Sequence, residues 1–264
     1  MTAQTVSDMG DTVSIGRILY RTVAAEQTRL WSVKATWWFV AVAATLMVGL
    51  GAVVGFEAAA CPPDLAGEPA WTAVRFLALP AQFALLALAV TAVTSDYATG
   101  GIVPTLQWTP RRTILLTART MVIAVIVTSV GVILAAACAL AAFATARSAL
   151  TLPLGDGLDR LASIAFVFAA GTVIAASVGF LLRSTAGALV TVFLLMLVLP
   201  VLLRLFGEWA SALAELLPGS GAIFLIGGQV PGMTTTSSLI VMLAWALTLG
   251  LLGWLRLLRT DAHR

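Results

Sequence analysis

The sequence predicts an all-α integral membrane protein with six transmembrane helices, an N-terminal amphipathic helix, and a re-entrant helical segment between the fifth and sixth spans. Hydrophobic residues make up 60% of the chain and charged residues only 10%, and the mean hydropathy is +1.03. Soluble domains are usually about a quarter charged, so lipid is the expected solvent. The apolar residues form separate blocks, each close to the roughly 20 residues that a helix needs to cross hydrocarbon. The blocks are rich in Ala and Leu and lack the alternation of a β-barrel, which favours helices.

The apolar blocks also set the expected domain organisation. A cytoplasmic N-terminal region, residues 1–34, precedes a transmembrane domain, residues 35–264. The predicted spans are residues 35–56, 76–93, 121–146, 161–182, 187–205 and 239–258. An even number of spans places both termini on the same side of the membrane.

The distribution of Lys and Arg predicts which side that is. Short cytoplasmic loops retain positive charge. With both termini inside, the inner segments hold eleven basic residues: Arg17, Arg21, Arg29, Lys34, Arg111, Arg112, Arg119, Arg183, Arg256, Arg259 and Arg264. The outer segments then hold four: Arg75, Arg147, Arg160 and Arg204. We therefore expect a multi-pass protein of the plasma membrane with cytoplasmic N- and C-termini. Topology accounts for the net charge of +3, and no basic tract indicates nucleic-acid binding.

The expected amphipathic helix covers residues 14–34 and could lie along the inner membrane surface. Its apolar side carries Ile15, Leu19, Val23, Leu30 and Val33, and its polar side carries Arg17, Arg21 and Thr28. Glu26 falls in the middle of the apolar side, where an unpaired carboxylate is costly. Two explanations remain open: Glu26 has a buried partner, or the helix ends nearby.

A second unusual segment, residues 207–237, lies between the fifth and sixth spans. It contains no Lys or Arg and many large apolar residues, so it is too apolar for a plain loop. Two short interfacial or re-entrant helices, broken at Leu217, Pro218 and Gly219, would satisfy the backbone and bury these residues. A partial seventh crossing is less favoured, because Pro218 and several glycines interrupt the segment.

The sequence lacks the residues that membrane-embedded catalysis would need. The single histidine, His263, is the penultimate residue, which removes a Ser-His pair, a His-rich zinc site and the HExxH pattern. The sequence also has no phosphate-binding GxxxxGK[ST] loop. The spans hold almost no ionisable residues, which counts against ion-coupled transport. Arg119, near the start of the third span, is the main exception, and we expect its side chain to snorkel to the inner interface. We expect no enzymatic activity and no cofactor in this chain.

The inner loop between the second and third spans is compact and polar, and Gly and Pro residues break it into short segments. Asp96, in residues 94–102, could cap a short helix across the membrane face. Pro110 begins the approach to the third span, and Arg111 and Arg112 anchor that approach at anionic headgroups. The alternative is an ordinary positive-inside loop with no further role.

At this loop the chain resembles the membrane subunits of type-2 ABC transporters, the ABC-2 permease family, in its six-span actinobacterial form. Residues 26–38, EQTRLWSVKATWW, look like the family's N-terminal stretch, and residues 94–119 look like its central signature. Residues 181–187 and 216–218 resemble its later turns. Asp96 stands where the family usually has glutamate, Gly101 where threonine is common, and Arg119 where lysine is frequent.

The resemblance implies a permease subunit of an ATP-driven exporter that forms the translocation pathway. Its inner loop would form a coupling helix that docks on a separate cytoplasmic ATPase, which binds ATP and Mg²⁺, and the N-terminal amphipathic helix would join that contact. A second permease subunit, identical or different, would complete the assembly, and the apolar segment after the fifth span would close the exit. The implied coupling residues are Asp96, Tyr97, Gly100, Arg111, Arg112 and Glu26. Two other functions stay open: a non-transporting scaffold or sensor, and an ion-coupled secondary transporter. An apolar pathway favours a lipid-like or amphipathic cargo.

Overall fold

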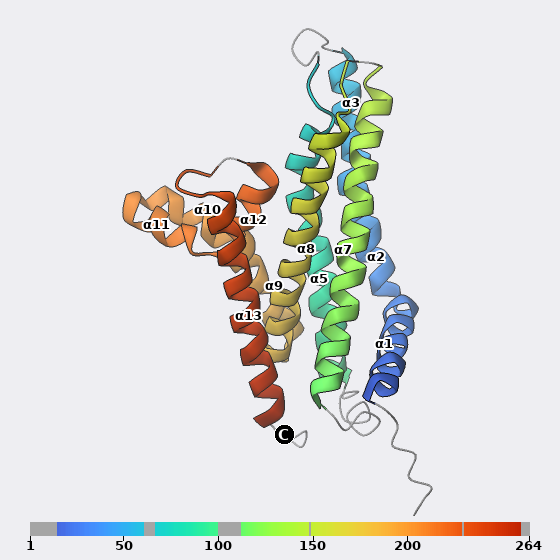
Figure 1. Ribbon diagram of the computed structural model, residues 1–264, viewed down its shortest axis with the longest axis vertical. Coiled ribbons are helices and arrows are strands. Elements are labelled where there is room, and N and C mark those ends of the chain that lie inside the picture. Colours follow the sequence, from blue (N-terminus) through green and yellow to red (C-terminus); the bar gives the residue numbers. More distant parts are fainter. Residues whose placement is uncertain (1–14, 61–66, 100–111, 148, 229, 260–264) are drawn as a thin grey trace, which may run out of the picture.

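A computed structural model describes residues 15–60, 67–99, 112–147, 149–228 and 230–259 (Figure 1). This part of the chain folds into helices joined by short turns, with one isolated bridge between Pro69 and Thr151. Six helical segments within it are long and apolar enough to cross a membrane. The predicted all-helical architecture, with six helices long and apolar enough to span a membrane, is therefore confirmed for the described residues.

The first four spans match the predicted apolar blocks but extend beyond them. Hydropathy marks the apolar centre of a span, whereas the backbone hydrogen bonds of a helix continue into its polar ends. The first span consists of α2 (Lys34–Ala44), η1 (Thr45–Gly49) and α3 (Leu50–Ala60); the next three are α5 (Trp71–Thr99), α7 (Arg112–Thr145) and α8 (Leu154–Leu182).

The last two spans form a separate group on one side of the molecule, next to α8 (Figure 1). The fifth span consists of α9 (Thr185–Phe193), η2 (Leu194–Val198), α10 (Leu199–Leu203) and η3 (Arg204–Phe206), and the sixth is α13 (Thr235–Arg259). The N-terminal helix α1 (Ile15–Ser32) lies at the other side and packs against α7. In Figure 1, α1 and the C-terminal end of α13 lie at the same end of the molecule.

The core of the bundle surrounds α8, which packs against α5, α7 and α13. Large side chains of α8 such as Ile164, Phe168 and Ile174 are fully buried. Glycines allow the neighbouring helices to approach closely, as is common between helices in membranes. A Cβ on Gly131 of α7 would collide with the ring of Phe168, and a Cβ on Gly55 of α3 would collide with Thr145 of α7.

Two short helices occupy the apolar segment between the fifth and sixth spans. Helices α11 (Glu208–Glu215) and α12 (Pro218–Gly227) meet at an angle of 84°, with the break at Leu216 and Leu217. Pro218 begins α12, a position at which its missing N–H costs nothing. The indole Nε1 of Trp245 on α13 donates to the carbonyl of Leu216 over 2.8 Å and anchors the break to the sixth span.

Candidate functional site

Four charged side chains from three helices meet at the end of the bundle where α1 lies. We call them the charge cluster: Glu26 and Arg29 of α1, Asp96 of α5, and Arg119 of α7. Arg119 donates to both carboxylate oxygens of Glu26, from Nη2 to Oε1 over 2.7 Å and from Nε to Oε2 over 3.1 Å. Its Nη2 also lies 2.8 Å from Oδ2 of Asp96. Arg29 completes the cluster by pairing with Oε2 of Glu26 at 3.2 Å and with Oδ1 of Asp96.

The charge cluster is buried to different depths. The side chain of Arg119 is 1% exposed, those of Glu26 and Asp96 are 11% exposed, and that of Arg29 is 32% exposed. Two positive charges meet two negative charges, so the cluster is neutral as a whole. Burying ions costs several kcal/mol each unless partners compensate, and removing one partner leaves an uncompensated charge. The cluster therefore fixes the relative positions of α1, α5 and α7.

This arrangement settles three questions that the sequence left open or answered wrongly. Glu26 has a buried partner, and α1 continues past it to Ser32. The expectation that Arg119 snorkels to the interface is wrong. Its guanidinium stays inside because two carboxylates from neighbouring helices hold it there. The expected helix cap at Asp96 is also wrong, since Asp96 lies in the last turn of α5.

A second set of contacts links the same end of α5 to the turn between α8 and α9. Thr94 and Thr185 share a hydrogen bond between their hydroxyl groups at 2.8 Å. The guanidinium carbon of Arg183 lies 5.4 Å from the centre of the Tyr97 ring, a cation–π arrangement. Arg183 has a left-handed backbone with φ of 53°, which ends α8 and directs the chain into α9. The hydroxyl of Tyr97 is buried and has no hydrogen-bond partner in the described part of the chain.

The end of α5 therefore joins both halves of the bundle, and we call Thr94, Asp96 and Tyr97 the α5 junction. Asp96 connects it to α1 and α7, while Thr94 and Tyr97 connect it to the α8–α9 turn. A displacement of this end of α5 must move or break contacts on both sides.

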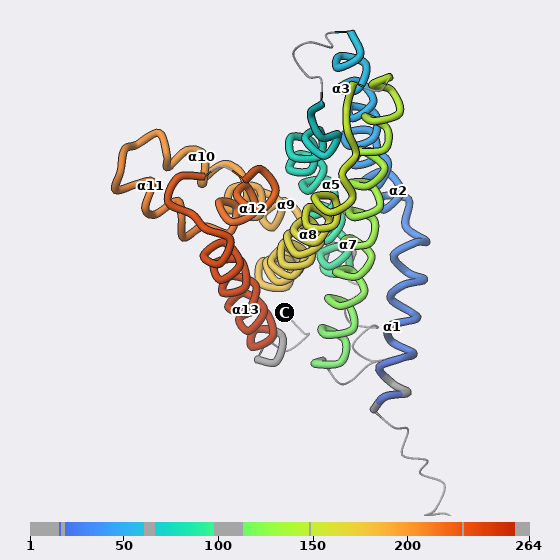
Figure 2. Tube along the Cα trace, turned by 45° about the horizontal axis from the view of Figure 1, so that its top comes forward, coloured from blue at the N-terminus to red at the C-terminus, as the bar shows by residue number. Residues whose placement is uncertain are grey.

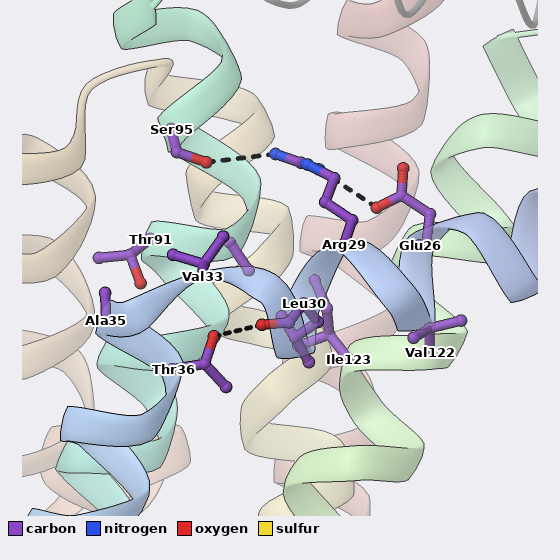
Figure 3. Close-up of a pocket in the computed structure, with 11 residues that line it drawn as sticks. Glu26, Arg29, Leu30, Val33, Ala35, Thr36, Thr91, Ser95, Val122 and Ile123 are labelled. Carbon is purple, nitrogen blue, oxygen red and sulfur yellow. Dashed lines mark hydrogen bonds and ion pairs between the residues drawn. The ribbon is translucent and has the colours of Figure 1, made fainter.

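A small cavity of about 90 Å³ lies beside the charge cluster, between α1, α2, α5 and α7. Figure 3 shows Glu26, Arg29 and Ser95 on one side of it and Leu30, Val122 and Ile123 on another. Drug-sized ligands need pockets of roughly 300–1,000 Å³, so this cavity does not hold such a substrate. Within the described residues, no group of three or more His, Cys, Asp or Glu side chains could hold a metal ion.

The structure describes only some of the coupling residues that the sequence suggests. Glu26 and Asp96 belong to the charge cluster, and Tyr97 lies next to it on α5. Gly100 and Arg111 lie outside the described residues, and Arg112 is placed only as the first residue of α7.

Sequence reasoning missed three residues of this site. Arg29 could have been found, because it lies three residues after Glu26 and so on the same side of a helix. No local signal pointed to Thr94 as a partner of Thr185 or to Arg183 as a partner of Tyr97.

Comparison with known proteins identifies no family for this chain. No family model matches the sequence, and no curated protein matches it at the level required for a relationship.

Proposed function

We propose that the chain is the membrane-spanning permease subunit of an ATP-driven exporter, coupled to a separate cytoplasmic ATPase. Two permease subunits, identical or different, would form the translocation pathway, and two ATPase subunits would supply the energy. The observation that carries this proposal is the α5 junction. It directly precedes residues 100–111, which lie outside the described residues, and its contacts reach α1, α7 and the α8–α9 turn.

The position of the loop supports a coupling role. The loop leaves α5 just after Asp96 and enters α7 shortly before Arg119, and these two residues form an ion pair with each other. A force on the loop therefore reaches α5 and α7 together, and α1 follows through Glu26. The same force reaches the α8–α9 turn through Tyr97 and Arg183. We assign Asp96, Tyr97, Gly100, Arg111, Arg112 and Glu26 to this coupling role.

The proposal includes an orientation in the plasma membrane. The end with the charge cluster faces the cytoplasm, as the excess of Lys and Arg there favours. On this assignment α1 is an interfacial helix that is tied to α7, and both termini are cytoplasmic. Helices α11 and α12 then form a re-entrant pair on the outer side, where they cover the end of the pathway.

The charge cluster argues against an ion-coupled secondary transporter. Coupling ions in such transporters bind near the bilayer midplane, often where helices are broken. Here the buried carboxylates lie near one end of the bundle, and two arginines already neutralise them. A secondary transporter also predicts solute movement that follows an ion gradient and needs no ATPase.

The decisive experiment isolates the chain with its partner from native membranes. We expect an affinity-tagged chain to copurify with an ATPase that carries a phosphate-binding loop, which mass spectrometry would identify. In lipid vesicles the complex should hydrolyse ATP and move a fluorescent amphiphile across the membrane. Absence of any copurifying ATPase, or amphiphile movement that depends on an ion gradient alone, would contradict the proposal.

Two variants that remove basic charge from the same end of the molecule test the loop itself. Replacing Arg111 and Arg112 by Ser should abolish ATP-driven transport by the complex, because the loop no longer engages the ATPase. Replacing the exposed Lys34 by Ser removes basic charge at the same end and should leave transport within about twofold of the unmodified chain. Equal transport by both variants would remove the coupling role from the loop.

A further inference from the structure

Two arginines bind the C-terminal end of α12. They lie near the start of α5, far from the α5 junction at its other end. Nε of Arg75, in the first turns of α5, donates to the carbonyl of Gly227 over 3.0 Å, and its Nη2 donates to the same oxygen. Nη1 of Arg160, on α8, donates to the carbonyl of Ile226 over 3.0 Å. Both side chains are half-buried, and the carbonyls that they bind are the last of α12.

The charges at this place do not balance. A helix C-terminus supplies about half a negative charge, whereas the two guanidinium groups carry two positive charges. Within the described residues, no carboxylate lies at ion-pair distance from Arg75 or Arg160. Asp156 lies one turn before Arg160 on α8 but forms no ion pair with either arginine. At the other end of the bundle, by contrast, two arginines meet two carboxylates.

The site also has N–H groups without a hydrogen-bond partner among the described residues. Nη1 of Arg75 and the Nε and Nη2 of Arg160 make no hydrogen bond to the described residues. Gly228 follows α12 with φ of +80°, and a Cβ there would lie 3.0 Å from Nη2 of Arg75. A side chain at position 228 would therefore crowd this guanidinium. Excess positive charge and spare N–H groups are the two features that an anion-binding site needs.

We propose that Arg75 and Arg160 bind a phosphate group beside the end of α12. Guanidinium groups match phosphate oxygens in paired hydrogen bonds, and a phosphate would balance the excess positive charge. Arg75 and Arg160 lie about 6 and 9 Å along the axis from the starts of α5 and α8, close to where lipid phosphates reside. The phosphate belongs either to a phospholipid headgroup or to a free phosphate ion. In both cases it bridges α5 and α8 and secures α12 between them.

The test measures ligand binding to the purified full chain and needs no ATPase, so its outcome is independent of the proposed transport function. Native mass spectrometry would count bound phosphatidylglycerol, with diacylglycerol of the same acyl chains as the phosphate-free control. We expect the unmodified chain to bind phosphatidylglycerol but not diacylglycerol at this site. The double variant Arg75→Gln/Arg160→Gln should weaken that binding at least about tenfold, because it removes two charged donors.

Inorganic phosphate distinguishes the two sources. Bound phosphatidylglycerol that millimolar phosphate displaces indicates a headgroup site. Binding of inorganic phosphate without any binding of phosphatidylglycerol indicates a site for a free ion. Either result supports the proposal if the double variant loses it. Equal binding of every ligand by the unmodified chain and the double variant would overturn it.

Two further variants separate a specific site from general charge attraction and from misfolding. Arg147, exposed at the end of α7, makes no described contact, and Arg147→Gln should bind phosphatidylglycerol as the unmodified chain does. Arg75→Lys/Arg160→Lys keeps the charge but loses the paired geometry, and we expect several-fold weaker binding from a normally helical protein. Equal loss in Arg147→Gln, or full binding by the Lys variant, would contradict a guanidinium site.

Discussion

Removal of Arg119 is the sharpest test of the charge cluster. Arg119→Met keeps most of the side-chain volume but leaves Glu26 and Asp96 to share Arg29. Breaking a buried ion pair by removing one partner typically costs about 3–5 kcal/mol. Because Arg29 still contacts both carboxylates, we expect the lower end of that range, a loss of about 3 kcal/mol in the free energy of unfolding. The matched variant Arg29→Met removes the same charge from a side chain that is one-third exposed, and should cost only about 1 kcal/mol.

The free energies would be measured by reversible unfolding in mixed micelles of detergent and dodecyl sulfate, followed by circular dichroism. A double variant makes the reasoning refutable. Glu26→Gln/Arg119→Met removes one charge of each sign and leaves the pair of Arg29 and Asp96 intact. It should therefore be less destabilised than the sum of the two single variants. A loss below about 1 kcal/mol for Arg119→Met, or strictly additive losses in the double variant, would refute the view that mutual neutralisation stabilises this end of the bundle.

Two further predictions concern packing. Gly219→Ala should destabilise the protein by about 2 kcal/mol, because its Cβ would collide with the backbone carbonyl of Met196, whereas Gly227→Ala has open space and should cost less than about 1 kcal/mol. Comparing their melting temperatures checks this prediction, and similar values would contradict the close approach of α12 to η2. Tyr97→Leu should lose about 1 kcal/mol of cation–π stabilisation with Arg183, whereas Tyr97→Phe should lose nothing, since the buried hydroxyl has no described partner. Equal melting temperatures for the two variants at this position would argue against the cation–π contact.

The spans were predictable because each is a local property of the chain. A run of apolar residues long enough to cross lipid is visible without knowing its neighbours, and all six predicted blocks correspond to helices. Their ends were less predictable. Residues 94–99 look like the start of a polar loop, but they continue α5, because Thr94 and Asp96 find partners on neighbouring helices.

The charge cluster was only partly predictable for the same physical reason. Glu26 was recognised as a costly carboxylate, yet its partner Arg119 is 93 residues away in the sequence. Such a pair depends on how α1 packs against α7, and no local pattern encodes that packing. Arg119 considered alone resembles any interfacial arginine. Only the proximity of two carboxylates from different helices explains why it stays buried.

The length of α5 has a geometric consequence. Helix α5, labelled in Figure 2, runs from Trp71 to Thr99, so Arg75 lies in its first turns and Asp96 in its last. These residues are separated by about 31 Å along the helix axis, so a rigid tilt of about 5° at one end would swing the other by nearly 3 Å. That swing is comparable to the 3.0 Å hydrogen bond from Nε of Arg75 to the carbonyl of Gly227, so a small tilt of α5 at its Asp96 end would break this bond to α12.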